Sequence, residues 1–255
     1  MIETRRSFHS QLDDIKREIT RLGAHVTEAI PVGTEALLGN DLQAAQKLID
    51  HDDVLDELAI QIEERCYTIL ALQQPMARDL RLIITTIRLA AELERSGDLM
   101  VNVCKGARRI YPSDLPPNIR GLVQQMSEQA TTLMRMAMDA HAEGDAGLAG
   151  ALDDMDDRLD KLHADYIQAV LTWGAEGDIQ HAVQLALIGR YYERIGDHAV
   201  NIGERVRYMV DGWLPEHAGA ARVQARKPMW TDDDGDNGED EDSISAGEEP
   251  EDPAE

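Results

Sequence analysis

The sequence contains little cysteine, few aromatic residues and no long apolar run. Two cysteines, Cys66 and Cys104, are too few for the disulfide framework of a secreted protein, so we expect a cytoplasmic location. Aromatic residues make up 4% of the chain and strand-like alternation is absent, which favours helix packing over sheets. No apolar run reaches the ~18 residues of a membrane span, and no apolar signal core follows the N-terminus. These absences predict a soluble, helical protein.

Positive charge is also scarce. The formal net charge is −24 at pH 7, from 25 Lys and Arg against 49 Asp and Glu. Much of the excess lies between positions 232 and 255, where acidic residues are dense and Lys and Arg are absent. Binding to a nucleic-acid backbone requires clustered Lys and Arg. The composition therefore predicts that nucleic acid is not a partner.

The chain contains an internal repeat. The segment ERSGDLMVNV at positions 94–103 returns as ERIGDHAVNI at positions 193–202. A second segment, DDVLDEL at positions 52–58, returns as DDRLDKL at positions 156–162. Repetition of this kind indicates a duplicated structural unit, here of about 100 residues.

Turn-forming residues divide the chain into six helical segments. These segments cover about residues 7–38, 41–72, 76–110, 117–143, 145–173 and 178–212. Because the links are short, neighbouring helices should be antiparallel, and the predicted fold is all-α, a tandem repeat of two three-helix bundles. Pro31 is expected to kink the first helix, or to split it near Ile30, because proline lacks a backbone donor.

Three regions follow from this pattern. Residues 1–112 are expected to form the first bundle and residues 117–213 the second. Residues 214–255 are expected to be a linker followed by a disordered acidic tail, because they contain too few apolar residues to offset the entropy of ordering.

Each half carries two acidic pairs at i, i+4 spacing on the helices of one predicted hairpin. In the first hairpin, Asp52 and Asp98 are equidistant from the turn at Pro75, and so are Asp56 and Glu94. Antiparallel helices both rise ~1.5 Å per residue, so residues equidistant from a turn lie at the same height. The same symmetry about the turn at Ala175–Gly177 relates the acids of the second half, which are Asp156, Asp160, Glu193 and Asp197.

Converging carboxylates indicate a metal site. Glu94, Asp98 and Asn102 continue a predicted apolar stripe of Leu80, Ile84, Ile87 and Ala91. Carboxylates on a partly buried face need a compensating cation. The neighbouring arginines, Arg95 and Arg194, point ~100° away from the stripe and would have to reach round their own helices. A metal ion is therefore favoured as the compensating cation. Oxygen ligands suit Mg²⁺, Ca²⁺, Mn²⁺ or iron, and bridging carboxylates allow more than one ion. His198 could add a nitrogen ligand in the second half.

Two features of the sequence, a pair of glycines inside helices and a second apolar stripe, each allow two structural interpretations. Gly97 and Gly196 lie inside helices at a cost of about 1 kcal/mol each. They indicate either a close approach at the site or tight packing between helices. A second apolar stripe could pack inside the bundle or contact another subunit; it consists of Leu82, Leu89, Leu93 and Met100.

The doubled Glu-Arg-x-Gly-Asp-x-x-x-Asn motif, with PMARDLR at positions 75–81, resembles the PhoU family of accessory and regulatory proteins of bacterial phosphate-specific transport. The likeness covers about residues 5–212. It implies two similar three-helix bundles, homodimers, and metal sites of one or more ions (Fe, Zn, Mn, Mg or Ca) on E/D-x-x-x-D motifs. The matching positions are Asp52, Asp56, Glu94, Asp98, Asn102, Asp156, Asp160, Glu193, Asp197 and Asn201.

The resemblance also implies a function. Family members act in the cytoplasm as negative regulators of phosphate uptake and of phosphate-starvation signalling, the Pho regulon. The implied partners are the ATPase subunit of the phosphate ABC transporter and a phosphate-sensing histidine kinase, and the membrane is reached only through them. Three features depart from the family pattern: Leu99 in place of the His found at position 198, Pro31, and the acidic tail.

The sequence favours a non-enzymatic adaptor. It contains no phosphate-binding glycine loop, no G-x-S-x-G elbow and no kinase signature. The alternative is a carboxylate-bridged metal-binding bundle, either an iron store or a di-metal enzyme. Ferritin-like sites use Glu-x-x-His on two helices, and the nearest sequence here is the single Asp160–His163 segment. A third class is a helical scaffold that binds no metal.

Overall fold

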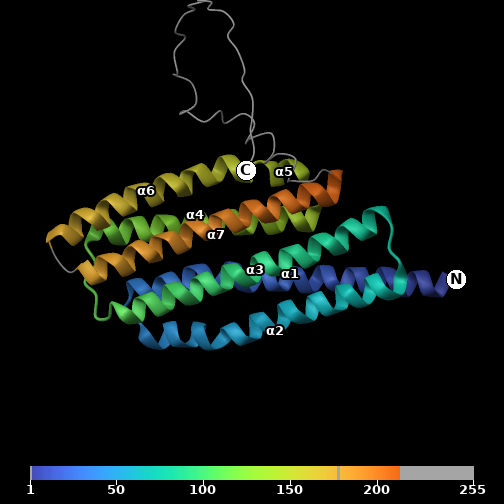
Figure 1. The fold of residues 1–255 in the computed structure, drawn as a ribbon, viewed down its shortest axis with the longest axis horizontal. Helices are drawn as coiled ribbons and strands as arrows, with labels where there is room; N and C mark the ends of the chain where they lie inside the picture. Colours follow the sequence, from blue (N-terminus) through green and yellow to red (C-terminus); the bar gives the residue numbers. More distant parts are fainter. Residues whose placement is uncertain (1, 177–178, 213–255) are drawn as a thin grey trace, which may run out of the picture. The chain divides into compact units, whose positions relative to one another are not determined.

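The computed structural model of the protein describes residues 2–176 and 179–212 (Figure 1). Within these ranges the chain is helical apart from short links, and it contains no strand. The helices are α1 (Ile2–Leu38), α2 (Leu42–Gln73), α3 (Ala77–Arg109), α4 (Pro117–Glu143), α5 (Ala146–Gly150), α6 (Leu152–Glu176) and α7 (Ile179–Asp211). The predicted all-α fold of two three-helix bundles is confirmed.

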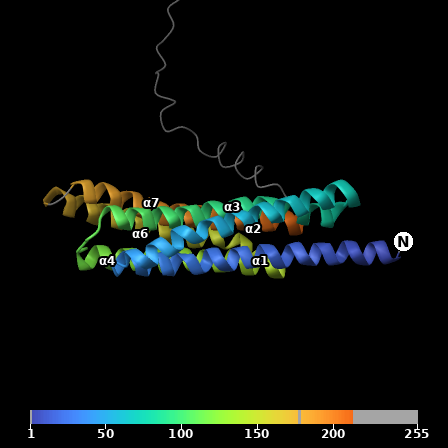
Figure 2. The same cartoon turned by 90° about the horizontal axis from the view of Figure 1, so that it is seen from below.

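The two bundles pack against each other through their inner helices. The first bundle consists of α1, α2 and α3, and the second of α4, α6 and α7. Helix α3 contacts α7 and α1 contacts α4, whereas α2 and α6 each contact helices of their own half (Figure 1). Figure 2 shows α1 and α4 on one side and α3 and α7 on the other. Residues from both halves therefore share one continuous hydrophobic core. The division into two separate domains remains a prediction.

A buried group of hydroxyls lies where the halves meet. The Thr34 hydroxyl of α1 is 2.8 Å from the Ser127 hydroxyl of α4 and 2.6 Å from the Tyr192 hydroxyl of α7. It is also 2.7 Å from the Ile30 carbonyl oxygen. Because unpaired buried hydroxyls destabilise a fold, this group holds three helices from both halves in one arrangement.

Helix α1 continues through Pro31, so the predicted split near Ile30 is wrong. Ile30, Thr34 and Leu37 are all buried on either side of the proline. Their packing against neighbouring helices outweighs the one backbone hydrogen bond that proline removes. The next helix start was predicted correctly, since the Asp41 side chain accepts hydrogen bonds from the backbone N–H groups of Gln43 and Ala44.

The segment expected to form one helix from about residue 145 forms two, with a break at Ala151. The backbone of α5 approaches α7 at Gly203, where an added Cβ would lie 2.8 Å from the Ala149 carbonyl oxygen. This contact depends on a glycine more than 50 residues away, so local sequence patterns did not reveal it. The predicted acidic tail lies outside the described residues. None of the described helices is long and apolar enough to span a bilayer.

The two apolar stripes of α3 have different environments. Leu82, Leu89, Leu93 and Met100 are buried in the core, which settles their role as packing within the protein. The other stripe, from Leu80 to Ala91, is only half-buried. The acidic residues that continue this stripe therefore lie at the edge of the core, as expected for a partly buried face. There water reaches part of each carboxylate.

Candidate metal centre

The first candidate site lies between α2 and α3. Asp52 and Asp56 of α2 and Glu94 of α3 are half-buried, and Asp98 of α3 is exposed. Burial, followed by the charges of Asp56 and Asp98, raises the pKa of Asp52 to about 6. Burial and then Asp98 raise the pKa values of Asp56 and Glu94 as well. The charge of Asp98 therefore lies close enough to disfavour the ionisation of the other three carboxylates.

The second candidate site lies between α6 and α7 and has an arginine, Arg190, beside its carboxylates. Burial, followed by the charges of Asp160 and Asp197, raises the pKa of Asp156 to about 7. Burial also raises the pKa of Asp197, although the nearby Arg190 opposes this shift. Glu193 forms an ion pair with Arg190 on its own helix. This half therefore brings a cation of its own to the acidic group.

Gly196 allows a carboxylate to approach α7 closely. A Cβ at this position would lie 2.3 Å from Oδ1 of Asp156 and 2.6 Å from Cδ2 of Leu159. At the equivalent Gly97, a Cβ would lie 3.3 Å from Cδ1 of Leu55 and would meet no carboxylate. Of the two open roles for these glycines, Gly196 serves close approach by a site residue and Gly97 serves packing between helices.

The donor set fits a hard cation. Oδ1 of Asp156 and Oε2 of Glu193 are buried and have no hydrogen-bond partner among the described residues. Burial and mutual repulsion disfavour the ionised form of these carboxylates, and a bound Mg²⁺, Mn²⁺ or Ca²⁺ would offset that cost through oxygen ligands. Among residues 2–176 and 179–212, however, no group of three His, Cys, Asp or Glu side chains is arranged to hold one ion. Metal binding by these residues remains a prediction.

His198 and Asn201 contact the other half of the protein. The Nδ1 atom of His198 lies 2.6 Å from Oε2 of Glu92 on α3. The Asn201 side-chain amide donates a hydrogen bond to the same oxygen, at 3.2 Å. The side chain of Asn102 is half-buried on α3. In this structure His198 and Asn201 therefore connect α7 to α3 and are already occupied by a carboxylate.

Glu92 was not predicted from the sequence, although the repeat contains a signal for it. Glu92 aligns with Tyr191 in the other half, and His198 aligns with Leu99. Both members of the contact thus depart from the repeat. Paired departures of this kind mark a contact that only one half makes.

Changing Asp156 to asparagine is expected to raise the free energy of unfolding of chelator-treated protein at pH 7.5. The neutral amide avoids the cost of an ionised carboxylate beside Asp160 and Asp197, which we put at about 1–2 kcal/mol after allowance for solvent screening. The pKa of Asp156 rises from 3.8 to about 7 on folding, so the wild type loses stability as the pH rises between these values. Urea unfolding at pH 5 and pH 7.5 measures both effects.

Asp154→Asn is the matched control for this experiment, since Asp154 is exposed on the same helix. It should leave the unfolding free energy nearly unchanged. An Asp156→Asn variant that is less stable than wild type at pH 7.5 would contradict the electrostatic account of the second site.

The comparisons with known proteins agree with this architecture. The PhoU domain family matches residues 19–107 and, a second time, residues 123–206. The chain is 32% identical over 212 residues to the phosphate-specific transport system accessory protein PhoU homolog of Rhizobium meliloti, covering 82% of this chain and 90% of that protein. It is 33% identical over 210 residues to PhoU homolog 1 of Mycobacterium tuberculosis, covering 82% and 95%.

Solved structures show the same fold. The crystal structure of PhoU from Pseudomonas aeruginosa is similar with a TM-score of 0.77 at 31% identity, covering 81% of this chain and 100% of that one. The phosphate transport system regulatory protein PhoU from Streptococcus pneumoniae is similar with a TM-score of 0.76 at 24% identity, which supports the fold alone. Since the domain match recurs in both halves and the relatives are covered almost completely, this chain belongs to the PhoU family.

Proposed function

We propose that this protein is a cytoplasmic accessory protein of phosphate-specific transport that keeps phosphate-starvation genes off when phosphate is plentiful. The observation that carries the proposal is the doubled PhoU match over a complete pair of bundles, in relatives named as accessory proteins of this transport system. Those relatives are named as accessory or regulatory proteins and not as enzymes. We assign this protein a non-enzymatic role.

The protein would act through contacts with other proteins. Its partners are proposed to be the ATPase subunit of the phosphate ABC transporter and a phosphate-sensing histidine kinase, with the active form a homodimer. Both halves present an outer helix, α2 or α6, that packs only against its own half and leaves its other side uncovered within residues 2–176 and 179–212. Long helices with uncovered sides can supply the surfaces that such contacts need.

The acidic clusters are proposed to bind metal ions that stiffen each hairpin. Asp52, Asp56, Glu94 and Asp98 would hold an ion in the first half, and Asp156, Asp160, Glu193 and Asp197 in the second. Support comes from the raised pKa values at Asp52 and Asp156 and from the unpartnered buried oxygens of the second cluster. A bound cation would neutralise the repulsion within each cluster and fix α2 to α3 and α6 to α7.

Deleting the gene is expected to switch phosphate-starvation genes on in cells grown with abundant phosphate. A reporter for such a gene should rise by about 5- to 150-fold, the change expected from losing a coupling of about 1–3 kcal/mol, and the full-length gene should restore repression. In the same cells, a tagged copy should co-purify with the transporter ATPase and the kinase. A reporter that stays off in the deletion strain would refute the regulatory role, and loss of co-purification alone would refute the partners.

A further inference from the structure

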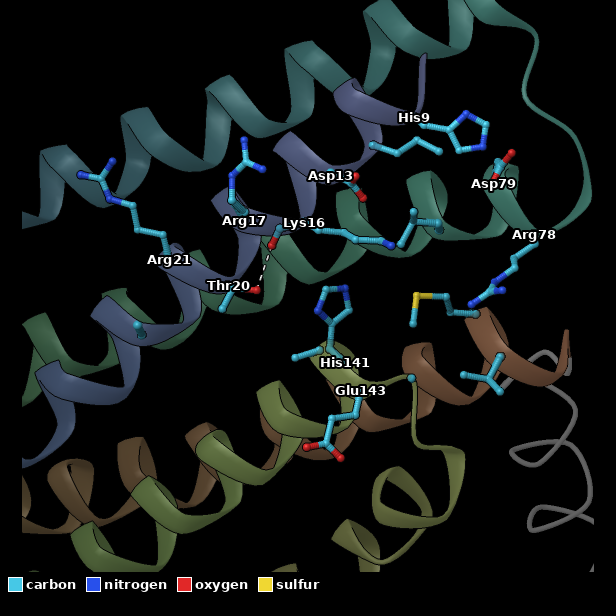
Figure 3. Close-up of a pocket in the computed structure, with 17 residues that line it drawn as sticks. His9, Asp13, Lys16, Arg17, Thr20, Arg21, Arg78, Asp79, His141 and Glu143 are labelled. Carbon is cyan, nitrogen blue, oxygen red and sulfur yellow. Dashed lines mark hydrogen bonds between the residues drawn. The ribbon is translucent and has the colours of Figure 1, made fainter. Parts of the chain in front are cut away.

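A large cavity opens at one end of the described helices, away from the acidic clusters. Its volume is about 1020 Å³, and it is lined by residues of α1, α3, α4 and α7 (Figure 3). The walls thus come from both halves of the protein. Part of the lining is apolar, from Leu12, Leu82, Met209 and Val210. A cavity of this size accommodates a small organic molecule.

His141 supplies an unpartnered polar group to this cavity. The residue is 5% exposed, yet neither Nδ1 nor Nε2 has a hydrogen-bond partner within the described part of the chain. Figure 3 shows the ring pointing from α4 into the cavity, toward Lys16 of α1. A buried polar side chain without a partner is destabilising, so its retention at a cavity wall indicates a bound group.

Two cationic side chains reach the same space. Figure 3 shows Lys16 and Arg78 extending into the cavity from α1 and α3. Neither the ammonium of Lys16 nor the guanidinium of Arg78 has a hydrogen bond or ion pair in the structure of residues 2–176 and 179–212. Arg17 and Arg21 also line the cavity, but their guanidinium groups point away from it.

These charges favour an anion over a metal ion. Burial, followed by the charge of Lys16, lowers the pKa of His141 to about 4, so the imidazole is neutral at pH 7 and can donate one N–H. A metal ion bound to this nitrogen would be repelled by Lys16 and Arg78. An oxyanion would instead accept hydrogen bonds from the imidazole, the ammonium and the guanidinium.

The donors come from three different helices and so approach the cavity from different directions. A tetrahedral phosphoryl group carries three terminal oxygens and can meet three such donors, whereas a planar carboxylate offers two oxygens. One phosphate ion would fill only a small part of a 1020 Å³ cavity. The remaining lining includes Asp13 and Asp79, whose carboxylates can accept hydrogen bonds from ligand hydroxyls.

We propose that this cavity binds a small phosphorylated molecule that carries hydroxyl groups, such as a sugar phosphate or a nucleotide. Lys16, Arg78 and His141 hold the phosphoryl oxygens, and Asp13 and Asp79 face the hydroxyls. Because α1 and α3 belong to one half and α4 and α7 to the other, the ligand would contact both halves at once. Binding would therefore strengthen their attachment.

The test is calorimetric titration of the full-length protein with glucose 6-phosphate, AMP and inorganic phosphate in parallel. At least one of the two organic phosphates should bind more tightly than inorganic phosphate. Lys16→Met should weaken that binding by about tenfold or more, as expected for a lost charge-assisted hydrogen bond. Arg21→Gln is the matched control, because Arg21 lines the cavity with its guanidinium turned away, and it should leave the affinity within about twofold.

A second readout follows His141 itself. The ring C–H signal of His141 in proton NMR, assigned by its absence in His141→Gln, should shift when the ligand is added. The titrations are repeated with the Glu94→Gln, Asp98→Asn, Glu193→Gln, Asp197→Asn variant, because phosphate oxygens can also coordinate a metal in the acidic clusters. Binding that disappears in this variant would overturn the proposal. So would binding by inorganic phosphate alone, an unchanged affinity in Lys16→Met, or no binding by any of the three probes.

Discussion

Changing Glu94, Asp98, Glu193 and Asp197 together to their amides is expected to abolish the metal binding proposed above for the wild-type protein. The amides keep the size of the side chains but lose the negative charge that hard cations require. Each cluster keeps only its two aspartates from α2 or α6, which is too few for the six to eight oxygen ligands of Ca²⁺ or for a bridged pair of ions. Elemental analysis of tag-free protein, before and after dialysis against chelator, measures the loss.

A control variant separates the clusters from overall charge. Glu57, Glu64, Asp154 and Asp165 are exposed on α2 and α6, and changing these four to amides removes the same total charge. This control should keep its metal. A four-amide variant of the clusters that retains metal at the wild-type ratio would refute the site, and so would a wild-type protein that carries none after growth in metal-supplemented medium.

The two halves should not lose metal equally. In the second cluster, Glu193 is already paired with Arg190, and Arg190 also opposes the rise in the pKa of Asp197. In the first cluster, the strongest charge effects on Asp52 and Glu94 come from the other carboxylates of the cluster. We therefore expect the Glu94→Gln, Asp98→Asn variant to lose more metal than the Glu193→Gln, Asp197→Asn variant.

Features that depend on a regular period could be predicted from the sequence. The Asp41 cap and the turn residues placed the helices within a few positions, because capping and helix breaking are local effects. The positions of Asp52 and Asp98, equidistant from Pro75, predicted that the first four acids lie near one another. This was possible because the two helices of a hairpin share a fixed rise per residue. Local geometry was sufficient for both.

Features that depend on contact between the halves could not be predicted. The path of α1 through Pro31, the break at Ala151 and the buried hydroxyl of Thr34 are all determined by helices distant in the sequence. The cavity at His141 is formed by four helices, and no periodic pattern identifies which side chains meet there. A hydrophobic stripe shows that a face is buried but not which helix covers it.

Replacing His198 with leucine, the residue at the equivalent position 99, is expected to lower the free energy of unfolding by about 3 kcal/mol. The side chains of His198 and Glu92 are only 7% and 15% exposed, and the substitution leaves the Glu92 carboxylate without its strongest partner. The Asn201 amide still donates a hydrogen bond to Glu92. The expected loss of unfolding free energy is therefore at the low end of the range for removing one partner of a buried charged group. Urea unfolding of chelator-treated protein at pH 7 measures it.

A double variant distinguishes this contact from a simple packing defect. Glu92→Leu combined with His198→Leu removes both polar partners, and its stability should return to within about 1 kcal/mol of wild type, since apolar pairs often replace buried ion pairs without loss. If the double variant is as unstable as His198→Leu alone, the loss comes from packing and not from an orphaned carboxylate.

The same contact should appear in the acid limb of the stability profile. Burial disfavours the ionised form of Glu92, but hydrogen bonds from His198 and Asn201 outweigh it and hold the pKa of Glu92 below its ordinary value of 4.5. A carboxyl whose pKa falls on folding stabilises the protein when the pH is above its ordinary pKa. This stabilisation is lost as the pH falls through the lower pKa that the group has in the folded protein. The wild type should therefore lose more stability between pH 5 and pH 3 than the double variant does. Equal losses in the two proteins would show that Glu92 makes no such contribution to the attachment of α3 to α7.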